Sequence, residues 1–351
     1  MKILVVADPH IPVPPRLYGG AERVVHLLCA GLREQGHTVR LLAGPGSQDY
    51  GGGLWVHRAP DASFLSRAVR KAWFQLLSRW AARGALDVVV NFGRLDYLVA
   101  LLRRTRLPLI CWFENPVAQS ELDWVLARRR RALRFVGVSH SQVEGLRADG
   151  RMQVIHNAVD TDQLDFQERP ATPPYVAFLG RLTRNKGVHL AIEAARRAGV
   201  ALKIAGNVSK GEEGAEEYFE REVRPHLGEG CEWIGPVNDE QKRALLQGAT
   251  ATLFPTQWKE PCAVVVPESL ACGTPVIAWR IASTPEVVRA GVSGYLCDSV
   301  EDMVAAIARV RAGALRREDC RREAQERFSQ DALVGRFLDL LGGQLPADSL
   351  R

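Results

Sequence analysis

The sequence has few of the features that mark secreted, membrane-spanning or metal-binding proteins. Its seven cysteines are an odd number and include no Cys-x-x-Cys pair, so neither a disulfide framework nor a zinc site of the usual spacing is expected. No apolar run reaches roughly 18 residues, and the one in MKILVVADPH ends early, at Asp8. We therefore expect a cytoplasmic protein with free thiols and no bound metal.

Dinucleotide and P-loop signatures are missing as well. The glycine pair Gly19–Gly20 forms no Gly-x-Gly-x-x-Gly pattern, no Walker lysine follows it, and the acidic ribose residue of nicotinamide enzymes is absent. A nicotinamide-dependent oxidoreductase is therefore not expected. What is present is an ordinary globular composition, with 351 residues of which 46% are hydrophobic and 25% charged. This length corresponds to two domains at roughly 100–200 residues each.

Strands alternate with helices in both halves of the chain. The first half opens with KILVVADPH, GGAERVVHLLCAGLREQGH and TVRLLA, and the second with YVAFLGRL, GVHLAIEAARRAG and ALKIAG. This alternation predicts an α/β protein of two Rossmann-like, doubly wound domains with parallel sheets. Segment 160–176 combines charge and three prolines without periodicity, so we expect a linker there and domains at 1–166 and 167–329. The amphipathic helix at the end of the chain, in 330–351, has no strand after it.

Positive charge is concentrated in the first half, where residues 1–165 hold 22 lysines and arginines against 15 aspartates and glutamates. Segment 63–84 predicts a basic helix with aromatic residues, and 128–134 adds five arginines. Such a surface can bind an anionic membrane, which would place the protein peripherally on the inner membrane face. The alternative is a solvated helix that packs its tryptophans into the core. Nucleic acid is not an expected partner, because no recognition motif accompanies the charge.

Two loops that follow strands could bind phosphate. Gly19 and Gly20 remove side chains where a helix begins, and backbone N–H groups there attract negative charge; a plain turn is the alternative. Arg181 and Lys186 flank the loop in FLGRLTRNKGVHLAI. Ligands of open parallel sheets bind beyond the carboxyl ends of strands, so these two cations suit a diphosphate. Two solvated surface cations are the alternative.

A later stretch of the second half contains two glutamates. In KEPCAVVVPESLACGTPVIA, Glu260 precedes a predicted helix over 263–272, and Glu268 lies within it. Carboxylates near a phosphate site would repel the ligand unless they bind hydroxyl groups. One glutamate could therefore bind a ribose and the other a sugar, while the helix start and the cations hold the diphosphate. The expected ligand is a nucleotide sugar.

This stretch resembles the Glu-x7-Glu signature of retaining glycosyltransferases of family 4, which have the GT-B fold. Further motifs of that family occur in the same order, among them YGGAERVVHLL, VIHNAVD, FLGRLTRNKGV, LFPTQWKEP and GVSGYLCDS. The resemblance implies two Rossmann-like domains facing across a cleft, with a last helix that crosses back to the first domain. It also implies an acceptor on the first domain and a nucleotide sugar on the second.

The resemblance assigns the site residues as well. Arg181 and Lys186 match the diphosphate-binding cations, Glu268 the ribose-binding carboxylate, and Glu260 the one that faces the donor sugar. Gly19 and Gly20 match the loop that approaches the phosphate and the reacting sugar. No metal or cofactor is implied, because the cations stabilise the leaving diphosphate. The donor is a nucleoside diphosphate sugar, with UDP or GDP favoured, and transfer to a hydroxyl acceptor (glycan, lipid-linked or small-molecule) retains the anomeric configuration.

Two departures from the family pattern bear on the site. Cys262 and Ala263 stand where the family commonly has Phe-Gly, so donor placement beside Cys262, Ala263 and Val264 could differ slightly. The first domain lacks the usual histidines in CWFENPVAQ and VVVNFGRLD. This leaves Glu114, Asn115 and Asn91 as polar candidates, with Glu114 as a conjectured acceptor of the hydroxyl proton. His10 is a further candidate, although a surface or structural role is the more common one for a single histidine.

Three functions follow from these observations. The first is an active glycosyltransferase. The second is a non-catalytic sugar-nucleotide-binding protein, which the missing histidines motivate. The third is a sugar-nucleotide epimerase of GT-B shape, although epimerases lack this Glu-x7-Glu arrangement.

Overall fold

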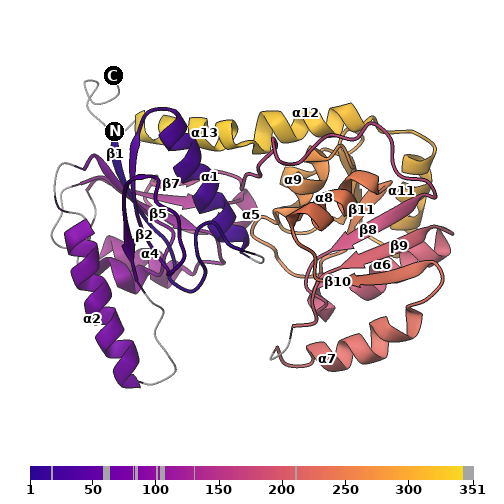
Figure 1. Ribbon diagram of the computed structural model, residues 1–351, viewed down its shortest axis with the longest axis horizontal. Coiled ribbons are helices and arrows are strands. Elements are labelled where there is room, and N and C mark those ends of the chain that lie inside the picture. Colours follow the sequence, from indigo (N-terminus) through magenta and orange to yellow (C-terminus); the bar gives the residue numbers. More distant parts are fainter. Residues whose placement is uncertain are drawn as a thin grey trace. The chain divides into compact units, whose positions relative to one another are not determined.

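The protein is represented by a computed structural model (Figure 1). It describes residues 1–16, 19–57, 64–81, 83, 86–99, 102, 107–129, 131–209 and 212–342, with only the backbone for 64–67, 70, 77, 78, 81, 96 and 97. The chain divides into two compact units. Unit 1 comprises Met1–Asn157 and Gln330–Arg351, and unit 2 comprises Ala158–Ser329.

Unit 1 is built on a seven-stranded parallel sheet in the order β3-β2-β1-β4-β5-β6-β7. Its strands are β1 (Lys2–Val6), β2 (Thr38–Ala43), β3 (Gly51–Val56), β4 (Val88–Asn91), β5 (Leu109–Phe113), β6 (Leu133–Gly137) and β7 (Met152–Val154). The central strands are apolar along both faces, and β4 is buried at every residue, as expected where helices cover both sides of a parallel sheet.

The helices of unit 1 include three that matter for the site: α1 (Gly20–Glu34), α2 (Phe64–Ala81) and α4 (Gln119–Leu126). Shorter ones are η1 (Leu95–Leu98) and α5 (His140–Val143). The last helix, α13 (Gln330–Gly342), packs on α1, where Gln330 Nε2 donates to Glu34 Oε2 at 2.6 Å. The expectation that the final helix returns to the first domain is therefore confirmed.

Unit 2 repeats the architecture with a six-stranded parallel sheet in the order β10-β9-β8-β11-β12-β13. Its strands are β8 (Tyr175–Leu179), β9 (Ala201–Ala205), β10 (Cys231–Gly235), β11 (Ala251–Phe254), β12 (Val276–Trp279) and β13 (Gly294–Cys297). Its helices are η2 (Arg184–Lys186), α6 (Val188–Arg197), α7 (Ala215–Tyr218), η3 (Phe219–Val223), η4 (Arg224–His226), α8 (Asp239–Gly248), α9 (Val265–Ala271), α10 (Thr284–Val287), α11 (Val300–Arg311) and α12 (Arg317–Phe328).

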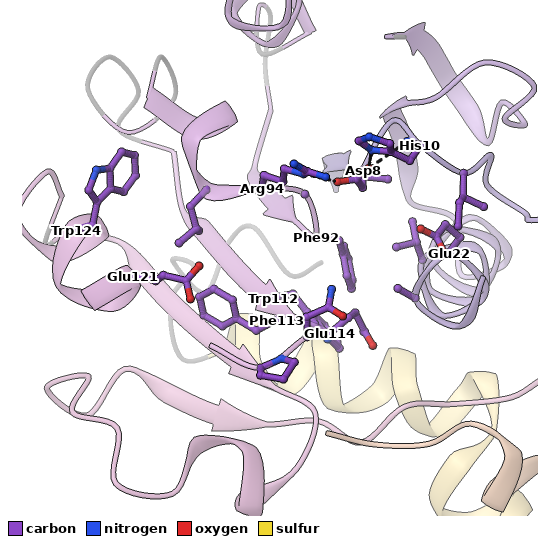
Figure 2. Close-up of a pocket in the computed structure, with 18 of the residues that line it drawn as sticks. Asp8, His10, Glu22, Phe92, Arg94, Trp112, Phe113, Glu114, Glu121 and Trp124 are labelled. Carbon is purple, nitrogen blue, oxygen red and sulfur yellow. Dashed lines mark hydrogen bonds and ion pairs between the residues drawn. The ribbon is translucent and has the colours of Figure 1, made fainter. Parts of the chain in front are cut away.

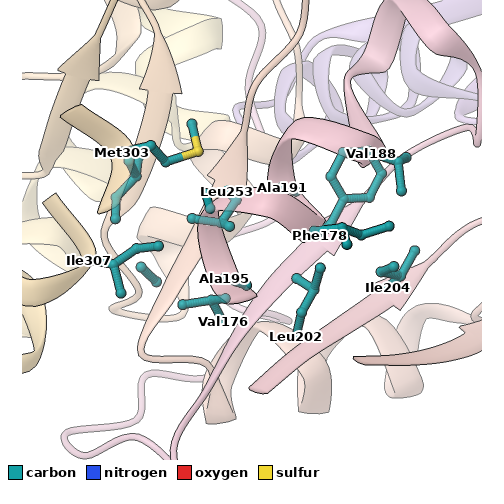
Figure 3. Packing of buried hydrophobic residues seen from close by; sticks show 14 of the residues in the cluster. Val176, Phe178, Val188, Ala191, Ala195, Leu202, Ile204, Leu253, Met303 and Ile307 are labelled. Atoms are coloured by element: carbon teal, nitrogen blue, oxygen red, sulfur yellow. The ribbon is translucent and has the colours of Figure 1, made fainter. Parts of the chain in front are cut away.

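The core of unit 2 lies between this sheet and helices α6 and α11 (Figure 3). Val176 and Phe178 of β8 meet Ala191 of α6 and Ile307 of α11, and all four are at most 2% exposed. This core holds β8 in a fixed position, and the loop after β8 carries the predicted basic pair.

The predicted domain boundary requires a correction. The structure divides the chain after Asn157, earlier than the expected division after residue 166. Segment 160–176 is not a free linker, because Arg321 and Arg317 of α12 donate to the carbonyls of Leu164 and Gln167, both at 2.6 Å. These bonds fasten the proline-rich segment to unit 2, so its composition indicated an irregular segment but not a boundary.

Candidate functional site

In each sheet the order in which the chain adds strands reverses at one point. The predicted site residues lie in the loops that follow the strands at that point. In unit 2 the chain winds outward from β8 on one side and from β11 on the other. In unit 1 the corresponding neighbours are β1 and β4. Open parallel sheets bind ligands beyond the carboxyl ends of strands at such switch points. The loops after these four strands are therefore the places to search for function.

In unit 2 the loop after β8 brings a cation against the loop after β11. Lys186 Nζ forms an ion pair with Glu260 Oε2 across 74 residues of sequence, and both side chains are largely buried. Thr256 and Gln257 in the loop after β11 donate to the carbonyl of Asn185, at 3.3 and 2.8 Å. These bonds hold the two loops together, so the structure places Lys186 and Glu260 in one site.

The turn that presents Lys186 depends on Gly187. Its φ is 76°, and a Cβ there would lie 2.1 Å from the carbonyl oxygen of Pro255. Only glycine combines this conformation with so close an approach of another backbone. Gly187 therefore lets the chain turn from η2 into α6.

The other two charged residues of the predicted donor site, Arg181 and Glu268, have partners that the sequence did not reveal. Arg181 Nη1 binds Glu212 Oε2 at 2.6 Å. Glu268 on α9 is 6% exposed and accepts from Lys242 Nζ of α8 at 2.6 Å. Neither Glu212 nor Lys242 belongs to a motif, so no sequence signal marks them. All four predicted residues are thus held in ion pairs.

Three predicted donor-binding residues lie between Glu260 and α9. Cys262 is buried, Ala263 is half-buried, and Val264 caps the helix, with its carbonyl accepting from the Glu268 N–H at 3.0 Å. This connection fixes the spacing of the two glutamates, because a short loop and one helical turn join them.

In unit 1, Gly19 directly precedes α1 and Gly20 is the first residue of that helix. Gly19 has a φ of 151°, and a Cβ on it would lie 2.7 Å from Cβ of Pro15 and 2.8 Å from Oε2 of Glu22. A side chain cannot be accommodated there without displacing the start of α1. The preceding residues, 17 and 18, lie outside the described part of the chain.

A cavity of about 940 Å³ opens at the switch point of unit 1 (Figure 2). The residues that line it follow β1 and β4, lie in or after the end of β5, or belong to α1, α2 and α4. They include Asp8, His10, Glu22, Lys71, Phe92, Arg94, Trp112, Glu114, Asn115, Glu121 and Trp124. Sequence reasoning named His10, Glu114 and Asn115 as candidates, and the structure brings all three to this cavity. Asn91 is not among its lining residues; it is 1% exposed and donates to the carbonyl of Gly93 at 2.7 Å.

Charge in the cavity is partly neutralised by a cluster around Asp8. Arg94 Nε binds Asp8 Oδ2 at 3.2 Å, and the Nδ1 atom of His10 contacts Asp8 Oδ1. His10 is therefore oriented by a carboxylate at the cavity wall. Glu121 has a structural role, because its Oε2 accepts from the Ala118 N–H at 2.8 Å at the start of α4.

Two further carboxyl groups in the cavity have unusual acidity. Burial raises the pKa of Glu114 to about 8, and the nearby charge of Glu22 acts in the same direction, whereas Asn157 and Trp112 oppose it. Burial also raises the pKa of Glu22, and Asp8 adds to this effect. Two carboxyl groups whose ionisation is disfavoured together at a cavity wall are typical of a functional site.

The basic segments 63–84 and 128–134 of unit 1 contain buried as well as exposed side chains. Arg129 is 9% exposed, donates to the carbonyl of Arg131 at 3.0 Å, and has a pKa that burial lowers. Arg129 is therefore not available to a partner, whereas Arg131 in the same segment is exposed. In α2, Phe74 is fully buried, but Trp73 is 46% exposed. Within 63–84 and 128–134, residues 63, 82, 84 and 130 are not described, nor are the side chains of Arg67 and Arg70.

In the described part of the chain, no helix is long and apolar enough to cross a membrane. The same residues contain no group of three or more histidines, cysteines, aspartates or glutamates placed to hold a metal ion.

Two α/β units with a polar site at each switch point define a class of two-domain ligand-binding enzymes, and comparison with known proteins specifies it. The sequence model of the family described as "Glycosyl transferases group 1" matches residues 160–327, and that of "Glycosyltransferase Family 4" matches 18–163. Together they account for most of the chain. The protein belongs to glycosyltransferase family 4, and it transfers a sugar from a nucleotide sugar.

Individual relatives agree with this assignment. Glycogen synthase of Mycobacterium tuberculosis is 27% identical over 391 residues, covering 94% of this chain and 91% of its own. Alpha-maltose-1-phosphate synthase of Mycolicibacterium smegmatis is 31% identical over 166 residues, covering 42% of each chain.

Solved structures confirm the GT-B fold. Sucrose-phosphate synthase from Thermosynechococcus elongatus superposes with a TM-score of 0.77 at 17% identity, over 97% of this chain and 98% of its own. AviGT4, a glycosyltransferase of avilamycin A biosynthesis, has a TM-score of 0.69 at 25% identity, over 96% of both chains. Anabaena HepE, solved with UDP and glucose, has a TM-score of 0.72 at 18% identity, over 98% of this chain and all of its own.

Proposed function

We propose that the protein is a retaining, metal-independent glycosyltransferase that binds a nucleoside diphosphate sugar on unit 2 and a hydroxyl acceptor in the cavity of unit 1. The observation that carries the donor assignment is the Lys186–Glu260 pair. It joins the loops after β8 and β11 at the switch point of the sheet. A cation and a carboxylate in contact there suit a ligand that carries both phosphate and hydroxyl groups.

The proposed donor contacts follow from charge. Lys186 and Arg181 bind the diphosphate, where Arg offers a fork to two oxygens and Lys a single mobile charge. Their present partners, Glu260 and Glu212, are released on binding. Glu260 then turns to the hydroxyls of the donor sugar beside Cys262, Ala263 and Val264, and Glu268 accepts from the ribose hydroxyls.

The same cations are the basis for proposing metal independence. Charge that accumulates on the leaving diphosphate is stabilised by preorganised donors, and removal of one such donor typically costs about 100- to 1,000-fold in rate. In this proposal the start of α1, left bare by Gly19 and Gly20, gives the reacting groups a close approach. Glu114 is the proposed contact for the acceptor hydroxyl.

The donor is tested with a panel of UDP-, GDP-, ADP- and TDP-sugars. A true donor raises the Tm of the native protein, because it binds only the folded state. UDP-sugars come first, since HepE was solved with UDP-glucose. The matched variants are Lys186→Ala, which should abolish the shift, and Arg184→Ala, which removes an exposed cation two residues away and should keep it.

Transfer and stereochemistry are then measured with the donor that binds. NMR of the first product formed should show the anomeric configuration of the donor, and EDTA should leave the rate unchanged. An inverted product would refute retention. Donor binding without hydrolysis or transfer to any acceptor would instead support the non-catalytic alternative.

We also propose a peripheral position on the inner face of the membrane, mediated by α2, for a protein that otherwise resides in the cytoplasm. Val69 and Trp73, one helical turn apart, are 59% and 46% exposed, and Lys71 and Arg79 on the same helix are exposed. Apolar and basic side chains together bind anionic lipid interfaces. Sedimentation with phosphatidylglycerol vesicles should be strong at low salt and weaker for Trp73→Ala. Equal sedimentation with neutral phosphatidylcholine vesicles, or none at low salt, would refute the proposal.

A further inference from the structure

The cavity of unit 1 contains buried polar atoms whose hydrogen bonds are incomplete. Trp112 is 2% exposed, and neither its Nε1 nor the buried Oε1 of Glu114 has a hydrogen bond of good geometry to a described residue, although the Trp112 N–H lies close enough to Glu114 to lower the pKa of its carboxyl. Both residues line the cavity. Buried polar groups are normally paired, and leaving one unpaired is costly. The cavity is therefore lined by polar groups whose hydrogen bonds a ligand could complete.

A hydroxyl group has the hydrogen-bonding capacity that would complete this site. An indole N–H only donates, an ionised carboxylate only accepts, and a protonated carboxyl does both; a hydroxyl, which also donates and accepts, can pair with each of them. The terminal torsion of glutamate is broad, so the Glu114 carboxyl can turn toward a ligand at little cost. Figure 2 shows Phe92, Trp112 and Glu114 grouped beside the helix that carries Glu22, so several hydroxyls of one ring could be bound together.

Charge in the cavity disfavours an anionic ligand. Asp8 is paired with Arg94 and His10, whereas no ion pair of Glu22 or Glu114 occurs among the described residues. The other charged groups that face the cavity are Lys71 and Glu121. A bound phosphate or carboxylate would oppose the ionisation of Glu22 and Glu114 still further, so it could bind only while both carboxyl groups stay protonated, whereas a neutral ligand sets no such condition.

The walls are aromatic as well as acidic. Phe92 and Trp112 stack with their ring centroids 4.9 Å apart and their planes at 27°, and Phe113 and Trp124 complete the wall. Flat apolar rings with a few convergent polar groups are usual in small-molecule sites of this volume. One face of a pyranose ring is apolar and its rim carries hydroxyls, which matches this combination.

We propose that the acceptor group bound in this cavity is an uncharged sugar, held by Trp112 and by the carboxyl groups of Glu22 and Glu114, and that these groups select against phosphorylated acceptors. This inference rests on the proposed function, because it names the substrate class for the acceptor side of the same reaction.

Saturation-transfer NMR on the protein with the identified donor nucleotide tests the selection directly. The probes are methyl α-glucoside, methyl α-galactoside and methyl α-mannoside, each compared with the corresponding hexose 6-phosphate. At least one neutral glycoside should show transfer to its ring protons, and its phosphorylated counterpart should not. Stronger transfer to a phosphate, or transfer to none of the glycosides, would overturn the inference.

Two variants test whether Trp112 and Glu114 bind the acceptor. Trp112→Phe keeps the ring and removes the N–H, and Glu114→Leu removes the carboxyl; each should raise the KM for the neutral acceptor about 2- to 10-fold, as for one lost hydrogen bond. The control is Trp233→Phe in unit 2, whose indole N–H donates to the Gly206 carbonyl at 2.9 Å; it should leave that KM unchanged.

Slow hydrolysis of the donor in the absence of acceptor separates the two claims. If Trp112→Phe and Glu114→Leu hydrolyse the donor normally and keep the acceptor KM of the native protein, the assignment of the acceptor to this cavity is wrong, whereas the proposed donor site and glycosyl transfer stand. If the native protein neither hydrolyses nor transfers any donor, the proposed function itself fails.

Discussion

Glu114 should make the stability of unit 1 depend on pH. Its pKa is raised from 4.5 to about 8, with burial as the main cause. Below about pH 4.5 the carboxyl is protonated in both the folded and the unfolded chain, so it contributes no pH dependence. Between pH 4.5 and 8 the folded state keeps a proton that the unfolded chain has released. The free energy of unfolding therefore falls as pH rises through this window and levels off above it.

The size of the effect follows from the shift. Each pKa unit corresponds to about 1.36 kcal/mol, so the change from 4.5 to about 8 sets an upper limit of about 5 kcal/mol. Glu114→Gln removes the ionisable group and keeps the shape. Relative to the native protein, the variant should gain stability as pH rises from 5 to 9. In a unit of this size, about 3 kcal/mol corresponds to a Tm difference of roughly 6–12 °C.

The assay is thermal unfolding of the native protein and Glu114→Gln by circular dichroism at pH 5, 6, 7, 8 and 9. Two units can unfold in separate steps, so the transition that responds to the substitution is assigned to unit 1. The comparison at pH 5 is the internal control, because the carboxyl and the amide are both largely uncharged in the folded state there. A Tm difference that stays constant from pH 5 to 9 would show that the Glu114 carboxyl is not buried as an acid.

Three further predictions concern unit 2. Lys186→Ala and Glu260→Ala should each lower kcat about 100-fold or more without a loss of fold, and unchanged turnover of both would contradict the site. Glu268→Ala removes the 2.6 Å partner of Lys242 and leaves it paired with the more exposed Asp239 at 3.2 Å, so it should cost about 1–3 kcal/mol in urea unfolding. The double variant Glu268→Ala/Lys242→Ala should recover part of this, and an additive loss would argue against a coupled pair. Arg317→Ala removes a guanidinium that donates to the carbonyls of residues 167, 247 and 249 at 2.6–2.8 Å, so the Tm of unit 2 should fall by about 5 °C or more, whereas an unchanged Tm would mean that these bonds contribute little.

Much of the secondary structure could be predicted because it depends on local pattern. The helix α1 buries Val24, Leu28 and Leu32 at intervals of four residues, and β1 is a short apolar run. Helix α12 escaped prediction, because it is strongly polar and is held by packing on α9 rather than by an apolar stripe of its own. The boundary was misplaced for a related reason, since carbonyl contacts to Arg317 and Arg321 cannot be seen in composition.

The sequence by itself determined the family, the alternation of strands and helices, and the loops that carry function, because a parallel sheet brings the carboxyl ends of its strands to one edge. It thereby identified Arg181, Lys186, Glu260 and Glu268 as candidates. Only the tertiary structure decided the partner of each charge and the acidity of Glu114. Ion pairing and desolvation depend on which side chains, distant in sequence, share a small volume from which water is excluded, and no local pattern encodes that.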